Sequence, residues 1–188
     1  MNYLVIALVL LASPLLSQPQ TLSVKPAFEL EIDPLAYALK GYSLHGIVQL
    51  KQTRFDLGVY GIETPGKLMG NEGFSVRTTG FGIKVNQLFG SVKVLYTGID
   101  FGYAETTAIH EKTQLQDQGH SLSLGAHLGY RYFPFLKKSN ALRGIYLTPW
   151  AGISYTQPYD KINLTTYTNN RLGYFAALHL GYRFNAWR

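Results

Sequence analysis

The strongest constraint on the fold is an alternation of apolar residues with polar residues or glycine, which repeats every two positions. The clearest example is the last stretch, where one face holds Leu172, Tyr174, Ala176, Leu178, Leu180, Tyr182 and Phe184, and the other Gly173, Phe175, Ala177, His179, Gly181 and Arg183. Successive side chains point to opposite faces of a β-strand, whereas an amphipathic helix has a period of 3.6. The pattern therefore predicts an all-β chain whose strands are apolar on one face only.

The same alternation recurs along the chain and predicts about eight strands. We place them near residues 27–39, 42–51, 54–63, 76–87, 90–104, 120–133, 144–156 and 171–184. Pro34 and Pro149 fall inside two of these strands, where we expect a bulge, a bend or a break, because proline lacks the backbone N–H that a sheet uses. The alternation also slips in phase near Gly98, which predicts another bulge.

The predicted connections differ in length from one end of the sheet to the other. The turns at Gln52-Thr53 and at Leu88-Phe89 are tight, whereas three connections are long and polar: 64–75, 105–119 and 157–170. Short turns on one side and long loops on the other are typical of outer-membrane barrels. Two connections fit this asymmetry less well, since 40–43 is short for an outer loop and 134–143 is long for a turn.

Composition also favours a lipid-facing surface. Charged residues make up 15% of the 188 residues, against roughly 25% in a soluble domain. The chain has no cysteine, which excludes disulfides, thiolate metal sites, cysteine nucleophiles and a lipidated cysteine. The net charge is +6, but the Lys and Arg residues are scattered and Lys137-Lys138 is the densest pair, so we expect no nucleic-acid binding.

The first residues have the properties of an export signal. An apolar run from Tyr3 to Leu16 is too short to span a bilayer as a helix, and Ser17 is a small residue at a plausible cleavage point. We therefore expect a signal peptide at 1–17 and a mature domain at 18–188; the alternative is a buried first strand or helix of a cytosolic protein. No later stretch reaches 18 apolar residues, so any membrane span must be a closed barrel.

Aromatic residues gather at the predicted strand ends, as they do where a barrel meets the two membrane interfaces. They are Tyr130, Tyr132, Phe133, Phe135, Tyr182, Phe184 and Trp187. The run Tyr182-Arg183-Phe184 resembles the terminal aromatic-x-aromatic signal of outer-membrane barrels, although His179 stands where that signal usually has glycine and residues 185–188 follow it.

With these features the chain resembles the small eight-stranded outer-membrane barrels of Gram-negative bacteria, the OmpA-barrel, OmpX and OmpW group, and the uncharacterised outer-membrane β-barrel families. The resemblance covers nearly all of the mature chain as a pattern. It implies a closed antiparallel up-and-down transmembrane β-barrel of about eight strands. It also implies contact with outer-membrane lipid and lipopolysaccharide, and insertion by the barrel-assembly machinery.

The predicted interior is polar and of mixed charge. Its candidate residues are Glu29, Glu31, Asp33, His45, Asp56, Lys84, His127, Arg131, His179 and Arg183. Closure of the barrel should bring Arg183 near Glu29 and His179 towards Asp33. The lumen of eight strands is just wide enough for side chains to fill, so we expect a salt-bridged plug; the alternative is a proton path or a small-ligand site.

A short internal repeat lies in this interior. Residues 127–132 (HLGYRY) recur as 179–184 (HLGYRF). One interpretation is a paired His/Arg site. The other is that two strands with the same facing and depth converged on the same pattern.

Catalytic, metal and cofactor motifs are missing from the sequence. His127 and Ser123 would lie about 13 Å apart on one strand, His120 adjoins Ser121, and no G-x-S-x-G or metal-ligand spacing is present. We therefore expect a non-enzymatic outer-membrane barrel with a structural or surface-interaction role, without a cofactor; the oligomeric state stays open. The alternatives are a lipid-modifying enzyme, a conduit for small apolar compounds, and a soluble periplasmic barrel with its apolar faces inward.

Overall fold

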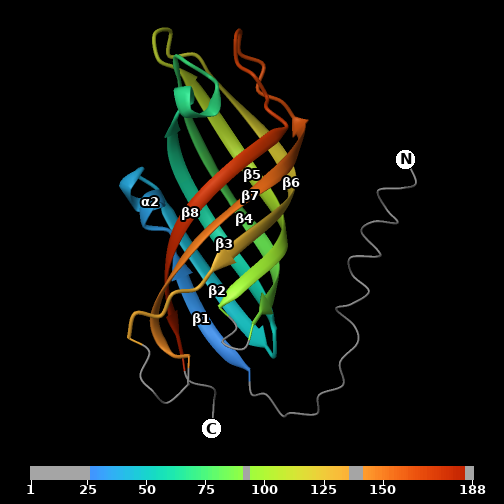
Figure 1. Ribbon diagram of the computed structural model, residues 1–188. Helices are drawn as coiled ribbons and strands as arrows, with labels where there is room; N and C mark the ends of the chain where they lie inside the picture. The colour runs from blue at the N-terminus through green and yellow to red at the C-terminus, as the bar shows by residue number, and fades with distance from the viewer. Residues whose placement is uncertain (1–25, 91–93, 136–141, 185–188) are drawn as a thin grey trace, which may run out of the picture.

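The chain folds into eight antiparallel strands that close into one barrel (Figure 1). The computed structural model describes residues 26–90, 94–135 and 142–184. The elements are β1 (Ala27–Ile32), α2 (Pro34–Ala38), β2 (Tyr42–Leu50), β3 (Thr53–Pro65), the 3-10 helix η2 (Gly66–Met69), β4 (Phe74–Phe89), β5 (Leu95–His110), β6 (Gln116–Tyr130), β7 (Gly144–Asp160) and β8 (Leu172–Arg183). The expected signal at 1–17 and the residues after Phe184 lie outside the described residues.

Cross-strand partners fix the tilt of the strands. Followed once around the barrel from Glu29, the partners lead to Gly173 on β8, whereas Glu29 itself pairs with Arg183. The register is therefore staggered by ten residues. With roughly 3.3 Å per residue and 4.8 Å between eight strands, this stagger gives a tilt of about 40°. That value is typical of membrane barrels.

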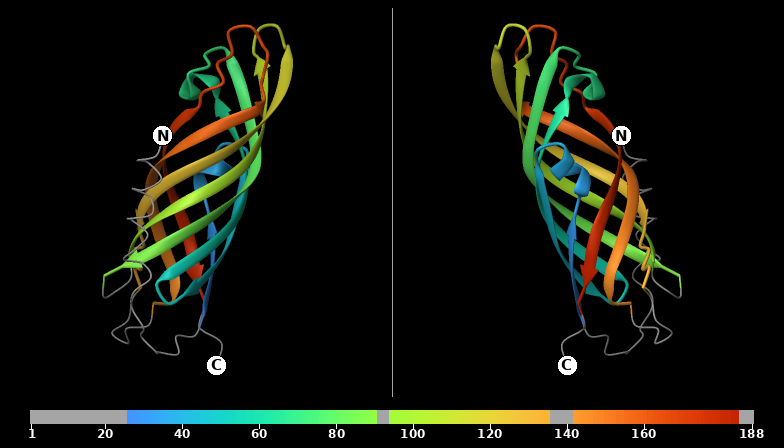
Figure 2. Two further views of the ribbon diagram at one scale, coloured as in Figure 1. Left: turned by 90° about the vertical axis from the view of Figure 1, so that its right-hand side faces the viewer. Right: turned by 90° about the vertical axis from the view of Figure 1, so that its left-hand side faces the viewer.

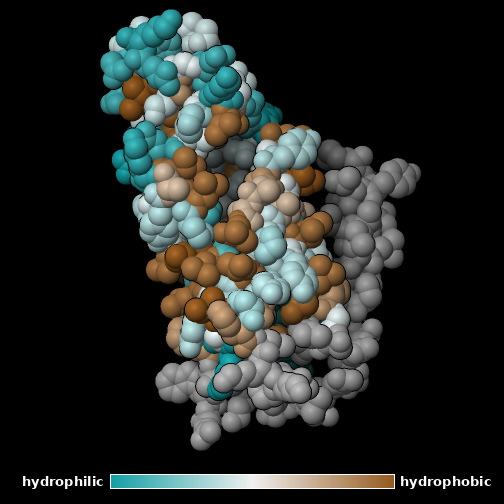
Figure 3. Space-filling view, turned by 60° about the vertical axis from the view of Figure 1, so that its left-hand side comes forward, coloured by the Kyte–Doolittle hydropathy of each residue, from teal (hydrophilic) through white to brown (hydrophobic). Residues whose placement is uncertain are grey.

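The alternation in the sequence separates the two faces of the wall as predicted. On β8, Leu178, Leu180 and Tyr182 are exposed on the outside, whereas His179 and Gly181 are buried in the lumen. The same arrangement holds for the other strands, and the space-filling view shows apolar side chains around the wall below a hydrophilic upper end (Figure 3). No helix among the described residues is long and apolar enough to cross a membrane.

Aromatic side chains border this apolar band. At the lower end, where β1 begins and β8 ends, Tyr130, Tyr132, Tyr182 and Phe184 are exposed. At the upper border four rings stack across four strands, Phe81 on Tyr103, Tyr103 on His120 and His120 on Tyr159, with centroids 5.5 to 6.2 Å apart. From His120 to Tyr130 the strand advances ten residues, which at this tilt is about 25 Å along the barrel axis.

The first predicted strand is shorter than expected, because β1 ends at Ile32. Pro34 is the first residue of α2, and Asp33 caps this helix by accepting a 2.9 Å hydrogen bond from the backbone N–H of Leu35. Proline at the first helical position after an Asp cap is a favoured helix start. The break expected at Pro34 is thus confirmed, and the strand predicted to 39 is wrong in its second half.

The irregularities expected at Gly98 and at Pro149 have different outcomes in the structure. The register of β4, β5 and β6 is continuous through Gly98, so the bulge predicted there is wrong. At Pro149 the β7–β8 register is continuous, but the β6–β7 ladder stops at Gly129–Trp150 and resumes only at the Tyr132–Leu147 bridge. Pro149 would have to donate to Tyr130 in the alternating antiparallel pattern, and it has no N–H to donate.

The upper end of the barrel is longer than the sequence suggested. Residues predicted as a loop at 105–119 are mostly strand, since β5 continues to His110 and β6 begins at Gln116. Phe74 and Val76 of β4 and Ala108 of β5 form a small apolar core with Ile162 of the loop 161–171. The lower turn also lies later than predicted, because Phe89 is still in β4. The long connection after β6 remains, with β7 starting only at Gly144.

Glycines on the inner face make room for aromatic rings from neighbouring strands. A Cβ at Gly181 would lie 2.4 Å from the ring of Tyr146, and one at Gly129 would lie 2.4 Å from Tyr96. Both rings are buried. Gly46, by contrast, has no atom within 4 Å of a built Cβ.

We therefore predict that Gly181→Ala lowers the free energy of unfolding by about 1 to 3 kcal/mol, because the methyl group must displace a buried ring. Gly46→Ala, which adds the same methyl group where space is open, should change it by less than about 0.5 kcal/mol. Urea unfolding of the detergent-solubilised barrel measures both. Equal losses for the two variants would contradict the packing described for the inner face.

Candidate functional site

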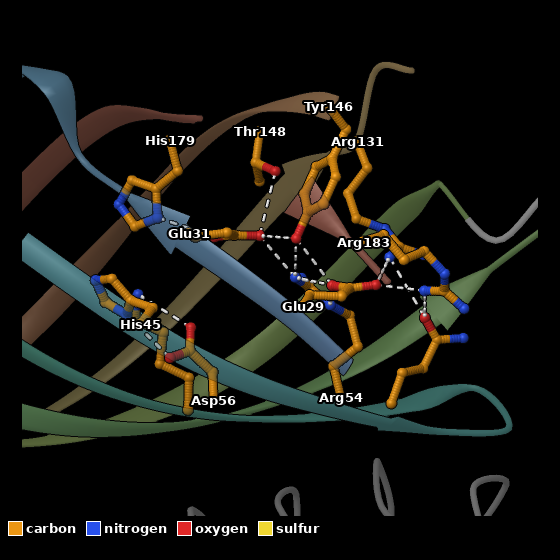
Figure 4. A network of polar contacts seen from close by, with 12 residues as sticks. Glu29, Glu31, His45, Arg54, Asp56, Arg131, Tyr146, Thr148, His179 and Arg183 are labelled. Carbon is orange, nitrogen blue, oxygen red and sulfur yellow. Dashed lines mark hydrogen bonds and ion pairs between the residues drawn. The ribbon is translucent and has the colours of Figure 1, made fainter. Parts of the chain in front are cut away.

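The lower lumen holds a network of ion pairs centred on the carboxylate of Glu29 in β1 (Figure 4). Arg54 from β3 binds Glu29 Oε2 through Nε at 3.0 Å and Nη2 at 2.7 Å. Arg131, just after β6, binds Oε1 at 2.7 Å, and Arg183 from β8 binds the same oxygen. Gln49 accepts hydrogen bonds from both of these arginines. One carboxylate thus joins strands from around the whole barrel.

Glu31, two residues further along β1, extends the network upward. Arg54 Nη2 binds its Oε1 at 2.7 Å, and the Tyr146 hydroxyl lies between the two carboxylates, 2.9 Å from Glu29 and 2.8 Å from Glu31. His179 Nδ1 lies 3.0 Å from the other Glu31 oxygen. Glu29, Glu31 and Arg54 are all at most 3% exposed, so solvent does not screen these contacts.

A second group lies at mid-height around Trp150. Asp56 pairs with His45 at 2.9 Å and with Lys84 at 3.6 Å. The Lys84 ammonium lies 4.1 Å from the centroid of the Trp150 ring, a distance typical of a cation–π contact. Both His127 and His179 pack edge-on against the same indole, at 5.3 Å. A large aromatic ring and its polar neighbours therefore occupy the middle of the lumen.

A third group of polar contacts lies on the side of the lumen formed by β4, β5 and β6. His127 places Nδ1 2.8 Å from Asp100 and Nε2 2.6 Å from Asn86. Both His127 and Asn86 are buried.

Together the three groups balance their charges. The lumen holds four carboxylates, Glu29, Glu31, Asp56 and Asp100, and four cations, Arg54, Lys84, Arg131 and Arg183. Glu29, Glu31 and Asp56 form ion pairs with these cations, and Asp100 contacts His127. A buried charge is costly unless it is paired. Carboxylates and Lys or Arg side chains are thus equal in number in the lumen of the described strands, which suits a packed plug.

Nine of the ten residues predicted to line the interior are in these groups. They are Glu29, Glu31, His45, Asp56, Lys84, His127, Arg131, His179 and Arg183. Arg183 meets Glu29 as expected from closure of the barrel. Asp33 is the exception, because it caps α2, and His179 therefore binds Glu31 and not Asp33.

Several members of the network were missed in the sequence. They are Gln49, Arg54, Asn86, Tyr96, Asp100, Tyr146, Thr148 and Trp150. The alternation could have found two of them: Arg54 lies two residues before Asp56, and Asp100 shares its phase with Gly98 and Gly102. Tyr146 and Trp150 carry no such signal, because aromatic residues of a membrane barrel are expected at the membrane interfaces and not in the lumen.

The internal repeat places its residues equivalently on β6 and β8. Its two histidines flank Trp150, and its two arginines share one oxygen of Glu29. β7 lies between the two strands and supplies Tyr146 and Trp150. The His/Arg pairs thus meet in one network, in which every one of the four side chains also has a carboxylate partner.

Above the plug the lumen widens into a cavity of about 280 Å³. Its inner wall is lined mostly by small hydroxyl side chains of β4 to β7, including Thr78, Ser123, Ser154 and Thr156, with Tyr60 from β3. The loop 161–171 covers the cavity: Asn71 bonds both the N–H and the carbonyl of Thr168, at 2.7 and 3.2 Å, and Asn170 bonds the Met69 carbonyl at 2.8 Å.

The loop 161–171 is also tied to β6. Asp117 accepts hydrogen bonds from the backbone N–H groups of Asn163, at 2.7 Å, and of Gln118, at 2.9 Å. These two bonds, with the one from Asn163 the stronger influence, hold the pKa of Asp117 below its usual value.

The histidines have few hydroxyl neighbours that could act as nucleophiles. Within the described residues the hydrogen bonds from a Ser or Thr hydroxyl to a histidine are limited to Thr113 with His110, in an exposed turn. His127 contacts Asp100 and Asn86 and not Ser123, and His120 contacts Tyr103 and Asp160 and not Ser121. In the same part of the chain no three His, Asp or Glu side chains are placed to hold a metal ion.

These features define the chain as a closed eight-stranded barrel with an apolar outer wall and a charged, packed lower lumen. Among solved structures it is similar to the crystal structure of Neisserial surface protein A (NspA), with 12% identity over 85% of this chain and 92% of that chain and a TM-score of 0.47. At this level the similarity carries no functional information. No protein-family model and no curated protein matches the chain.

We predict that Glu29→Gln lowers the free energy of unfolding by about 3 to 5 kcal/mol, because it leaves two buried arginines, Arg54 and Arg131, and the part-buried Arg183 around a neutral amide. Glu111→Gln makes the same change in an exposed turn and should have an effect below about 0.5 kcal/mol. Urea unfolding of both variants measures the difference.

A second substitution separates charge imbalance from lost packing. Glu29→Gln leaves one excess positive charge in the lumen, and Arg183→Gln added to it removes one cation and restores the balance, so the double variant should be more stable than Glu29→Gln alone. Losses that simply add would show that Glu29 and Arg183 do not interact.

Proposed function

We propose that this chain is an outer-membrane β-barrel protein without catalytic activity, which seals its own lumen and presents its upper loops for structural or surface interactions. The observation that carries the proposal is the inverted distribution of residues: large apolar side chains face outward, while four ion-paired carboxylates and four cations are packed inside. In water this surface would be an extended apolar patch of the kind that aggregates.

The dimensions of the wall support the location. The apolar band between the two aromatic borders is about 25 Å tall, which is the height of the lipid-facing band in outer-membrane barrels. The strand tilt of about 40° also fits. In a soluble periplasmic barrel the large apolar side chains would face the lumen and the charged ones the solvent, which is the opposite of the observed distribution, so we set this alternative aside.

The orientation follows from the connections. The start of β1 and the end of β8 share the lower end with the tight β2–β3 turn, so we place this end in the periplasm, and η2 and the loops 111–115 and 161–171 outside. α2 lies lower than these loops, beside the upper half of β8 (Figures 1 and 2). We also propose that the chain is related to the OmpA-barrel, OmpX and OmpW group, which its sequence pattern resembles. Outer-membrane lipid, lipopolysaccharide and, during insertion, the barrel-assembly machinery are the proposed partners.

The two alternative functions have less support. A conduit for small apolar compounds would need an apolar path, and the lower lumen is filled by charges. A lipid-modifying enzyme would need a nucleophile oriented by a base, and the buried histidines contact carboxylates and an amide. We therefore propose no conduction and no catalysis for the plugged half of the barrel.

The proposal predicts that the full chain fractionates with outer membranes and that its folded form migrates differently on SDS gels before and after boiling. A closed barrel resists SDS until heat separates its strands, because the hydrogen-bonded ladders between neighbouring strands hold the ring together. Recovery in the soluble periplasmic fraction, without a shift on heating, would contradict it. Glu29→Gln should keep the membrane location but shift at a lower temperature.

The outer loops supply a further prediction. Asn71→Ala removes both hydrogen bonds to Thr168 and should increase the rate of tryptic cleavage at Lys161 or Arg171 by about tenfold or more, because the loop opens more often. Gln114→Ala, in a different exposed turn, is the control and should leave the rate unchanged. An unchanged rate for Asn71→Ala would show that these bonds do not hold the loop.

A further inference from the structure

The barrel wall is incomplete above β1. β1 pairs with β8 only from Glu29 to Ile32, opposite Arg183 to Leu180. β8 continues upward to Leu172 while paired with β7 alone. In the side view the ribbons of β8 and α2 diverge toward the upper end, and the space-filling view shows a hollow in the upper half of the surface (Figures 2 and 3).

The backbone along this seam lacks partners on one side. Phe184 donates its N–H to Phe28 of β1, so the even-numbered residues of β8 point their backbone groups away from β7. For Leu172, Tyr174, Ala176 and Leu178 the described residues contain no partner on that side. Their side chains are on the apolar outer wall, where unpaired backbone groups facing lipid are costly.

The sequence produces the seam through Pro34. In a continued β1, residue 34 would be the next to exchange hydrogen bonds with β8, opposite Leu178, and proline cannot donate. The helix α2 that follows satisfies the opposite edge instead. Gly41 donates to Ala36, and the Tyr37 hydroxyl donates to the Ser43 carbonyl at 2.8 Å.

The side of the upper cavity that no described residue lines faces the sector of the wall formed by β8, β1 and β2, which contains this seam. The lining of the cavity comes from β3 to β7, η2 and the upper loops, whereas β1, β2 and β8 contribute no residue. The hydroxyls of Ser123, Ser154 and Thr156 make no hydrogen bond to a described residue, so they are available to a ligand. Ser43 Oγ, on β2 opposite Tyr60, and Trp150 Nε1 are buried without a partner in the described chain.

The chemistry of the cavity defines the ligand. Its lining contains no Lys or Arg, and its one acidic residue, Asp160, has a side chain that is 58% exposed and lies near His120. A phosphate head group would need cations. Free hydroxyls and a volume of about 280 Å³ suit a neutral head group of about one sugar ring.

We propose that the seam and the upper cavity form one lateral binding site for an amphiphile with a neutral, hydroxyl-rich head group. The head group lies among the hydroxyls of β6 and β7, and the alkyl chain passes between α2 and β8 into the outer half of the lipid layer. The inference rests on the membrane location proposed above.

A second copy of the chain does not fit the same edge. Two barrels with the same membrane orientation are related by an axis along the membrane normal. Strands tilted by about 40° would then cross at about 80°, which precludes β-ladder pairing between the two β8 strands.

Octyl glucoside, glucose and octyl phosphate are the probes that test the proposal. The full chain with Trp187→Phe is held in an amphipathic polymer free of alkyl detergent, so that Trp150 is the only tryptophan. We expect a saturable change in Trp150 fluorescence with octyl glucoside below its micelle concentration, at least about tenfold tighter than with glucose, since burial of only two methylene groups accounts for that factor. Octyl phosphate should be weaker by a similar factor.

Two variants provide a matched control on one strand. Ser154→Phe fills the cavity and should weaken octyl glucoside binding about tenfold or more, whereas Ala151→Phe adds the same ring to the outer face and should not. A shift on boiling checks that both barrels are closed.

Three outcomes would overturn the inference. If glucose bound as tightly as octyl glucoside, the alkyl chain and therefore the seam would contribute nothing to binding. If octyl phosphate bound as tightly as octyl glucoside, the preference for a neutral head group would be refuted. If Ser154→Phe bound octyl glucoside as tightly as the unchanged chain, the ligand would not occupy the cavity. If the barrel still shifts on heating in the outer-membrane fraction, any of these results removes the binding site alone and leaves the proposed location intact.

Discussion

The pairing of β1 with β8 is the constraint on which the rest of the structure depends. Only four residue pairs close the ring, fewer than at any other strand boundary in the described barrel. Immediately inside this closure is Glu29, whose carboxylate binds arginines from β3, from the end of β6 and from β8. The ion pairs therefore cross the lumen where the backbone ladder is shortest, and they join strands that hydrogen bonding of the sheet alone would leave apart.

The charge balance of the lumen explains why the plug can be so polar. Each carboxylate faces a cation or a histidine, and Tyr146, Gln49 and Thr148 supply neutral hydrogen bonds around the two glutamates. Removal of water from ions is costly unless geometry and charge match. The network meets this requirement with arginine, whose planar donors bind two acceptors at once. Lysine appears higher in the lumen, where Lys84 contacts Asp56 and the face of Trp150.

The sequence predicted the facing of the strands well because one physical rule governs it. A residue at lipid depth must be apolar outside and can be polar inside, so a period of two indicates both the strand and its orientation. The same rule placed nine lumen residues and failed for Asp33, because the strand ended one residue earlier. Strand ends were harder to predict: polar residues at 105–119 are compatible with loop or with strand once the wall has left the lipid. The contacts across the lumen were not predictable, since they depend on a stagger of ten residues that no local pattern contains.

The position of Pro34 shows how one residue can divide the barrel into two functional halves. Below it, β1 completes the wall, and the lumen is filled by paired charges. Above it, the wall has one unpaired edge, and the enclosed space is lined by neutral hydroxyls. α2 satisfies the β2 edge through Gly41 and Ser43 but leaves β8 unpaired. A helix that served only to end the strand would have no reason to leave lipid-depth backbone exposed at the one place where a cavity adjoins it. The strand break, the unpaired edge and the unlined side of the cavity lie in the same sector of the wall, and this coincidence is what supports the proposed lateral binding site.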